Sequence, residues 1–214
     1  RTKRLEVFFP RVKLDSKLVL KFMINRDFAQ SNRWTKACVL FQIGILRIVD
    51  FKLDLIAQIF NPDPLIREVS AWALHQHDPA EYESNTRRLG EGLKRDLDAL
   101  IILSKKMTRF EMVLFFQKTN FFEKIPGITL SYLSDISEEI RIKEKDSLIL
   151  DEKHNNYFFI VVSGGVDFFQ RGEKVGEFTQ GQFIGEMLGL PNFVHTNLVI
   201  AKSDVVILKF NKDQ

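Results

Sequence analysis

Apolar residues in the first half of the chain recur at the spacing of amphipathic α-helices. From Lys17 to about Lys106 they lie three or four positions apart, and the polar breaks between them are short. This period predicts a series of helical hairpins. The residues that define the first hairpin, on either side of a polar turn at 25–32, are Leu18, Leu20, Phe22, Met23, Trp34, Cys38, Phe41 and Ile45.

Prolines interrupt the second predicted hairpin. Its first helix breaks at 61–64 (Asn-Pro-Asp-Pro), because proline lacks a backbone donor and disfavours helix in the residue before it. A second helix begins at Leu65 and ends before Asp78-Pro79. The apolar faces of these two helices are expected to be Leu53, Ile56 and Ile59, then Leu65, Val69, Trp72 and Ala73. Superposing 37–41 on 70–74 gives an offset of 33 residues, in the range of stacked helix-pair repeats.

The pattern changes after Met107. An aromatic-rich segment, 115–125, ends at Pro126-Gly127, and from Ile140 short apolar runs alternate with turn residues every eight to twelve positions. This spacing is typical of an all-β sandwich or barrel. The predicted strands are 139–143, 147–150, 157–163, 165–170, 174–178 and 205–210. We therefore expect an α+β chain with two domains, a helical one at 1–106 and a β-rich one with flanking helices at 107–214.

Composition agrees with folded domains in a reducing compartment. The 214 residues are 45% hydrophobic and 28% charged, which excludes a disordered chain. With 20 Phe against 2 Trp and 3 Tyr, most aromatic surface lacks a polar group and belongs in apolar cores or interfaces. The single cysteine, Cys38, excludes an intrachain disulfide and a multi-thiolate metal site. Cys38 lies on an apolar helical face, so we expect a buried thiol and a cytoplasmic protein.

No segment of the sequence is expected to cross a membrane. The longest apolar stretch, 37–51, is interrupted by Gln42, Arg47 and Asp50, and it is shorter than the ~20 residues that span a bilayer. No signal-peptide pattern opens the chain. Because the first residue is Arg1 rather than Met, we expect a fragment of a longer protein.

The two halves differ in charge. Residues 1–109 contain 20 Lys and Arg against 13 Asp and Glu, and residues 110–214 contain 11 against 15, so their net charges are +7 and −4. Such an asymmetry is compatible with internal docking, with an anionic surface as partner, or with ordinary solvated charge. Nucleic acid is not expected as a partner, since no basic stripe with interleaved aromatic residues accompanies the charge.

The helical pattern around the proline break resembles a HEAT repeat. The stretch 55–74 contains a helix, an Asp-containing turn, Arg67 soon after it, and small residues where adjacent helices approach. The resemblance covers roughly 16–88 and implies HEAT-like repeats. An unrelated helical bundle is the alternative, because hairpins with small residues occur in many bundles.

The second half resembles the cyclic nucleotide-binding domain of the catabolite activator and of protein kinase A regulatory subunits. Three segments match in family order: 114–127 for the helix and turn before the sheet, 157–166 for a central strand that ends in Ser-Gly, and 180–187 for the start of the phosphate-binding cassette. The resemblance implies a β-roll, similar to a double-stranded jelly roll, with flanking helices. In the family, hinge and lid helices follow the last strand, and the chain stops at Gln214 before them.

The resemblance also implies a ligand site. In the family, Gly-Glu opens a short helix whose amides face the cyclic phosphate, the Glu binds the ribose, and an Arg ten positions after the Gly pairs with the phosphate. The matching residues in this chain are Gly185, Glu186, Met187, His195 and Thr196. His195 therefore stands at the Arg position. Glycines of the family's early β-turns are replaced by Lys145, Glu152 and Asn155, of which only Asn readily adopts left-handed geometry.

Loss of the arginine is expected to weaken the site. A neutral imidazole lacks the charge of a guanidinium, which costs about 1.5–3 kcal/mol for a hydrogen bond to a charged group. That corresponds to roughly ten- to hundredfold or more in affinity. Two interpretations stay open. Glu186 and His195 either contact a ligand, or Glu186 only stabilises the start of its helix and His195 is a surface-loop histidine.

We expect a non-catalytic regulatory or interaction module with a degenerate cyclic nucleotide-binding-like domain, whose partner is another protein or the rest of its own chain. The alternative is a working sensor of cAMP or cGMP. No cofactor is expected beyond a weakly bound cyclic nucleotide or other anion. No metal site is expected, since His75 and His77 are two residues apart and point to different helix faces. No nucleophile lies beside a base, so an enzyme is not expected.

The order of the two domains also resembles the cytosolic tail of bacterial membrane carriers of the ATP/ADP translocase type. This likeness implies a bacterial protein at the cytosolic face of the inner membrane. The basic residues near the start, which fit a segment just inside a membrane, are Arg1, Lys3, Arg4, Arg11, Lys13 and Lys17.

Overall fold

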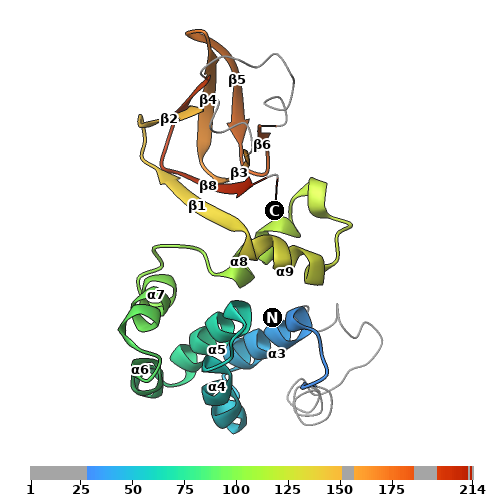
Figure 1. Cartoon of the computed structure of the whole chain (residues 1–214), viewed down its shortest axis with the longest axis vertical. Helices are drawn as coiled ribbons and strands as arrows, with labels where there is room; N and C mark the ends of the chain where they lie inside the picture. Colours follow the sequence, from blue (N-terminus) through green and yellow to red (C-terminus); the bar gives the residue numbers. More distant parts are fainter. Residues whose placement is uncertain (1–27, 151–156, 186–196, 212, 214) are drawn as a thin grey trace. The chain divides into compact units, whose positions relative to one another are not determined.

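The chain consists of helices followed by antiparallel strands, which confirms the predicted α+β class (Figure 1). The computed structural model describes residues 28–150, 157–185, 197–211 and 213. It divides the chain into a helical unit that ends at Glu111 and a roll unit that begins at Met112. The predicted helical segment at 17–24 lies outside the described residues.

In the helical unit, several helices begin at a capping side chain. Asn32 accepts a hydrogen bond from the Thr35 amide, and Asp63 caps α5, whose first residue is Pro64. Asp78 accepts from the amides of residues 80 and 81 at the start of α6. The elements are α3 (Arg33–Leu46), η2 (Val49–Phe51), α4 (Lys52–Ile59), α5 (Pro64–His77), α6 (Pro79–Arg87), α7 (Glu91–Ile101) and α8 (Arg109–Phe116), which continues into the second unit.

Helices α3 and α5 lie side by side and run in the same direction (Figure 1). Arg33, at the start of α3, forms a two-pronged ion pair with Asp63, the cap of α5, at 2.7 and 2.8 Å. At the other end, His77 Nε2 lies 3.1 Å from the Ile43 carbonyl oxygen. The helices touch closely between these contacts, because a Cβ on Gly44 would lie 2.6 Å from Trp72 Cζ3. Only glycine fits there.

The predicted apolar face of α4 is partly wrong. Leu53 is 79% exposed, whereas Leu55 and Ile59 are fully buried. The helix starts at Lys52, after the 3-10 turn that buries Phe51. The buried positions follow Phe51, Leu55 and Ile59 at steps of four, so only Ile59 of the predicted series belongs to the buried face.

The roll unit contains the predicted strands and three elements that the pattern did not indicate. The missed elements are α9 (Gly127–Asp135), β6 (Phe183–Ile184) and β7 (Asn197–Ala201). The others are η3 (Asn120–Phe122), β1 (Ser137–Ile142), β2 (Ser147–Leu150), β3 (Tyr157–Ser163), β4 (Gly165–Gln170), β5 (Glu173–Thr179) and β8 (Val205–Asn211). Each strand predicted from the spacing is present to within two residues at either end.

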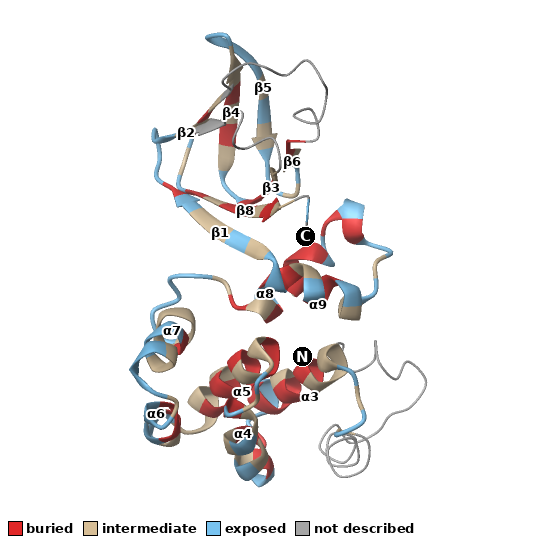
Figure 2. Cartoon of the chain, in the orientation of Figure 1, coloured by how far each residue is buried: buried red, intermediate tan, exposed pale blue. Residues whose placement is uncertain are grey.

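The described strands of the roll form two four-stranded antiparallel sheets. Their strand orders are β1-β8-β3-β6 and β2-β7-β4-β5. Apolar side chains from both sheets meet in one core that includes Phe159, Val161, Phe168 and Ile207. Figure 2 marks buried segments of β4 and β8 in red. On the other side of the first sheet, the Phe116 ring of α8 packs against Phe210 of β8, at a centroid distance of 5.9 Å. These phenylalanines thus lie in packed apolar regions, as the composition predicts.

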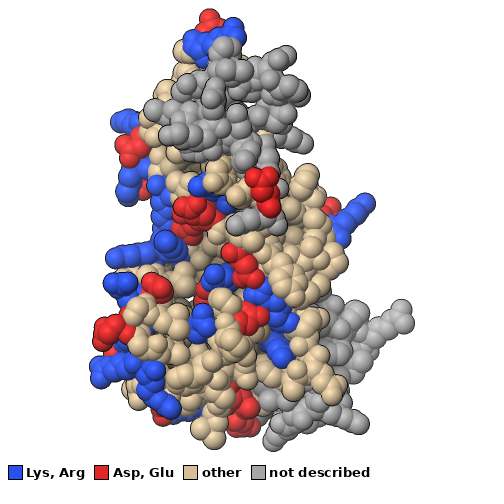
Figure 3. Space-filling model, viewed as in Figure 1, with Lys and Arg blue, Asp and Glu red and all other residues tan. Residues whose placement is uncertain are grey.

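Several charged side chains in the described part of the helical unit form ion pairs. Lys52 contacts Asp78 at 2.8 Å and Glu81 at 3.1 Å, and Lys94 contacts Asp98 at 2.6 Å. On the face drawn in Figure 3, acidic side chains accompany basic ones on this unit. In the part of the chain that the structure describes, no helix combines the length and the apolar character that a bilayer span requires.

Lys145 adopts a left-handed backbone conformation in the turn between β1 and β2, with φ of +68°. Its amide donates to the Ala201 carbonyl, and the Asp146 amide donates to the Lys143 carbonyl, so the turn is fixed on both sides. Left-handed geometry costs a residue with a Cβ about 1–2 kcal/mol. We expect Lys145→Gly to raise the free energy of unfolding by about 0.5–1 kcal/mol, after the entropy cost of glycine.

Chemical denaturation of the two variants Lys145→Gly and Lys145→Ala measures this effect. The alanine variant keeps the Cβ and the strain, so it controls for loss of the lysine side chain. The interpretation of strain is wrong if the glycine variant is no more stable than the alanine variant.

Candidate functional site

Only Gly185 of the five predicted ligand-binding residues lies in the described part of the chain. It follows β6 directly, and the short strand places it. Glu186, Met187, His195 and Thr196 lie outside the described residues, as do Glu152 and Asn155. Their proposed roles therefore stay predictions, and the structure bears on the site through its surroundings.

Strand β6 fixes the backbone that leads into Gly185. Ile184 pairs with Phe159, and Phe183 with Ile160, of the central strand β3. The preceding turn is also bound to β3, because the Gly181 amide donates to the Val161 carbonyl at 2.8 Å. The start of the predicted cassette is thus attached to the centre of one sheet.

Gly185 occupies a position that only glycine tolerates. Its φ is +117°, and a Cβ would lie 3.1 Å from both Phe158 Cα and the Tyr157 carbonyl oxygen. The residue is buried against β3. The glycine that opens the predicted cassette is therefore required by the backbone on two grounds, conformation and space.

Replacing Gly185 with alanine is expected to destabilise the roll by about 1–3 kcal/mol, the usual cost of a strained backbone conformation. Gly176→Ala in β5 is the matched control, because Gly176 has no neighbouring atom within 4 Å of an added Cβ and no positive φ. Thermal unfolding followed by circular dichroism compares the two variants. Equal midpoints would show that the conformation at Gly185 is not a constraint.

The interior of the roll offers no positive charge among its described residues. The core between the two sheets is lined by apolar side chains, and no described lysine or arginine of the roll unit is buried. The basic residues of the sheets point outward, as Lys174 and Lys202 do when they pair with Asp167 and Glu177.

Residues 139–214 match the family model of the cyclic nucleotide-binding domain. The chain contains a cyclic nucleotide-binding domain. The match begins in β1 and extends through the described sheets, so it coincides with the roll. The predicted resemblance of this half is thereby confirmed at the level of the domain.

Solved structures similar to the chain include two regulatory subunits of a cAMP-independent protein kinase A. The one from Trypanosoma cruzi, bound to guanosine, is 27% identical over 49% of this chain and 39% of that chain, with a TM-score of 0.42. The one from Trypanosoma brucei is 26% identical, with the same shares and a TM-score of 0.43. The chain thus spans about two fifths of the length of these subunits.

A third similar structure is the sensor domain of the transcriptional regulator DNR from Pseudomonas aeruginosa. It is 16% identical over 49% of this chain and 74% of that chain, with a TM-score of 0.42. The comparison with curated protein sequences gives no match.

Outside the cyclic nucleotide-binding domain, the histidines and the cysteine that the sequence offers as candidate functional residues take part in the packing of the helices. His75 meets the Tyr82 ring edge-on, at a centroid distance of 5.1 Å, and His77 contacts the Ile43 carbonyl. Cys38 is buried, as predicted, and burial raises the pKa of its thiol to about 12. Such a thiol stays protonated and unreactive near neutral pH. Within the described ranges, no three His, Cys, Asp or Glu side chains gather as metal ligands.

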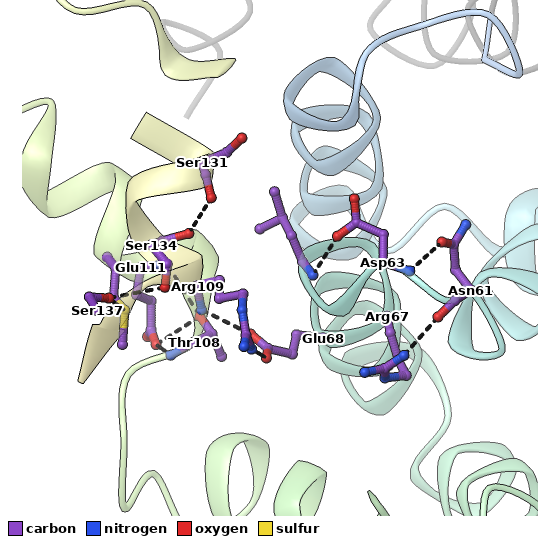
Figure 4. Close-up of polar contacts among 12 residues, drawn as sticks. Asn61, Asp63, Arg67, Glu68, Thr108, Arg109, Glu111, Ser131, Ser134 and Ser137 are labelled. Atoms are coloured by element: carbon purple, nitrogen blue, oxygen red, sulfur yellow. Dashed lines mark hydrogen bonds and ion pairs between the residues drawn. The ribbon is translucent and has the colours of Figure 1, made fainter. Parts of the chain in front are cut away.

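An ion pair between the buried Glu68 and the partly exposed Arg109 is not indicated by the sequence (Figure 4). The Glu68 side chain is only 5% exposed, and its carboxylate accepts from both the amide and the guanidinium of Arg109. Burial raises the pKa of Glu68, and the guanidinium of Arg109 opposes that rise. The pair attaches the start of α8 to α5. The partners are 41 residues apart, so no local pattern could indicate it.

The start of α8 is also closed by a capping box, which the sequence does show. Glu111 accepts from the Thr108 amide at 2.8 Å, and the Glu111 amide donates to the Thr108 hydroxyl at 3.2 Å (Figure 4). The Thr-x-x-Glu spacing before an apolar run is the signal that could have indicated it.

Proposed function

We propose that the chain is a non-catalytic regulatory and interaction module whose cyclic nucleotide-binding domain has a weakened ligand site. The observation that carries this proposal is the residue at position 195. The family places an arginine there, and this chain has His195, with no buried cation among the described residues of the roll to replace it. A phosphate bound at neutral pH would then lack its main charge partner.

The backbone supports a domain that keeps its fold while its site loosens. Gly185 retains the conformation that the start of the cassette needs, with φ of +117°. Lys145 instead stands in left-handed geometry where the resembled family has glycine. The roll thus tolerates a strained backbone conformation at Lys145, and it has glycine at position 185, where the backbone requires one.

A working sensor of cAMP or cGMP is the second candidate, and the match to the family model favours it. In that function Gly185, Glu186, Met187, His195 and Thr196 hold the cyclic nucleotide. Protonation of His195 would restore part of the missing charge, since an imidazole with an ordinary pKa of about 6.5 is mostly cationic at pH 5.5.

Thermal unfolding with and without cyclic nucleotide separates the two candidates. A ligand that binds only the folded state raises the midpoint in proportion to the logarithm of its concentration over Kd. With cAMP or cGMP in excess over the protein, we expect a smaller rise at pH 7.5 than at pH 5.5. A large rise at pH 7.5, as strong as at pH 5.5, would favour the working sensor and reject the weakened site.

We further propose that α3 to α7 are HEAT-like repeats. Two observations support this proposal. Helix α3 lies parallel to α5, and the same kind of ion pair, between the first residue of one helix and the capping residue of another, occurs between α3 and α5 and between α4 and α6. Arg33, the first residue of α3, binds the cap of α5, and Lys52, the first residue of α4, binds Asp78, the cap of α6. Arg67 donates to the Asn61 carbonyl and so closes the turn before α5 (Figure 4). Stacked helix pairs of this kind provide extended protein-binding surfaces.

The partner in this proposal is another protein or a further part of the same chain, and the location is the cytoplasm. A place beside a membrane, as in the tail of a carrier of the ATP/ADP translocase type, is supported only by the basic residues at the start of the sequence. The sequence of the complete gene tests this idea. Hydrophobic spans upstream of Arg1 would support it, and their absence would reject it.

A further inference from the structure

An open hollow of about 760 Å³ lies in the roll unit, outside the apolar core between the two sheets. One wall is the segment from the end of α8 into η3, and the other is the segment from β5 to β6. The walls meet at Thr119 and Gly181, where an added Cβ on Gly181 would lie 3.7 Å from Thr119 Cγ2. Every residue that lines the hollow is described.

Four phenylalanines provide its apolar surface: Phe115, Phe121, Phe178 and Phe183. Phe121 is 68% exposed, although its ring packs 4.7 Å from that of Phe183 and 5.1 Å from that of Phe122. An aromatic ring that is packed on one side and exposed to water on the other gains less free energy from burial than a core ring. Its exposed side is available to pack against a binding partner. Exposed apolar patches of this kind mark interaction sites.

The polar groups of the hollow favour an anionic occupant. Lys118, which is exposed, is its only charged lining residue, and no carboxylate lines it. The amide side chains of Asn120, Gln180 and Gln182 lie on the same surface and have hydrogen-bond donors. The Gln182 oxygen already accepts from Thr179, so the remaining capacity of this side chain is its amide donors.

We propose that this hollow binds a segment of a partner protein that presents an aromatic or aliphatic side chain beside a carboxylate. The apolar side chain packs on Phe121 and Phe183, and the carboxylate pairs with Lys118. The proposal rests on the proposed function as an interaction module, for which it names a docking surface. It does not depend on cyclic nucleotide, so either idea can fail without the other.

The test uses the full chain and two fluorescein-labelled peptides. In the first, phenylalanines alternate with glutamates, and in the second, lysines replace the glutamates. Fluorescence anisotropy measures binding without nucleotide. We expect the acidic peptide to bind and the basic peptide to bind at least about tenfold more weakly, because Lys118 repels it. No binding of the acidic peptide below about 1 mM, or equal binding of both, would overturn the proposal.

Two pairs of variants locate the site. Phe121→Ala and Lys118→Glu are each expected to weaken the acidic peptide about five- to tenfold. Their controls are Tyr132→Ala, an aromatic residue of the same unit that is 58% exposed outside the hollow, and Lys124→Glu, an exposed lysine nearby. The controls should bind like the unchanged chain. Equal losses in variants and controls would place the peptide elsewhere and overturn the assignment.

Discussion

Replacing His195 with arginine is expected to tighten the binding of cAMP about ten- to hundredfold at pH 7.5. The guanidinium is charged at every physiological pH, and its fixed pair of donors matches two phosphate oxygens. Histidine at this pH is mostly neutral and has one ring donor. The exchange therefore restores the charge partner that the resembled family has at this position.

Isothermal titration calorimetry of the two proteins with cAMP measures the change. His195→Gln is the control, since it keeps a neutral donor and should bind no better than the unchanged chain. His195→Lys should lie between, because an ammonium has the charge but not the forked geometry. If arginine gives no gain over glutamine, position 195 does not face the ligand.

Replacing Arg109 with methionine is expected to lower the stability of the helical unit by about 3–5 kcal/mol near neutral pH. Glu68 would remain as a buried carboxylate, 5% exposed, without its cation. The loss should shrink as the pH falls. Burial already raises the pKa of Glu68 in the folded protein, and without Arg109 that pKa rises further. Protonation below that pKa removes the buried charge, so the folded state regains stability on the acid side.

Tryptophan fluorescence makes this measurement specific. The chain has 2 tryptophans, Trp34 and Trp72, and both belong to the helical unit, so their emission in a urea titration reports that unit alone. The control is the double variant Glu68→Gln with Arg109→Met, which leaves no buried charge and should recover most of the loss. A double variant as unstable as the single one would show that the ion pair is not the cause.

Local sequence patterns predict those helices and strands whose ends are set by residues adjacent in the chain. The break at 61–64 and the turn at Gly164 follow from proline and glycine, whose effects are confined to adjacent residues. The two-residue strand β6 has no period to detect. Helix α9 was missed because Pro126-Gly127 was interpreted only as an end, whereas Pro126 precedes the first residue of this helix.

Contacts between distant residues could not be predicted from one sequence. Arg33 and Asp63 are 30 residues apart, and Glu68 and Arg109 are 41 apart. Each is an ordinary charged residue of a helix until the helices are packed. The same holds for the rotation of α4, which places Leu53 at the surface and Leu55 in the core. The aromatic hollow likewise brings Phe121 beside Phe183, which only the fold makes neighbours.

The candidate site also combines features that the sequence indicates with a physical reason that only the structure provides. Gly185 was predicted from the family motif, and the structure adds the reason, a positive φ and a backbone 3.1 Å away. The identity of residue 195 is read from the sequence, and its consequence follows from the chemistry of imidazole and guanidinium rather than from coordinates.

The dissociation constant of cAMP for the unchanged chain at pH 7.5 decides whether the ligand site is weakened. Relative to a site that binds at about 0.1 µM with an arginine in place, loss of the charge-assisted bond costs about ten- to hundredfold, so we predict a Kd of about 1–10 µM or weaker. Submicromolar binding at that pH would contradict the account, because it would show that the domain grips the cyclic phosphate without the cation that its family uses.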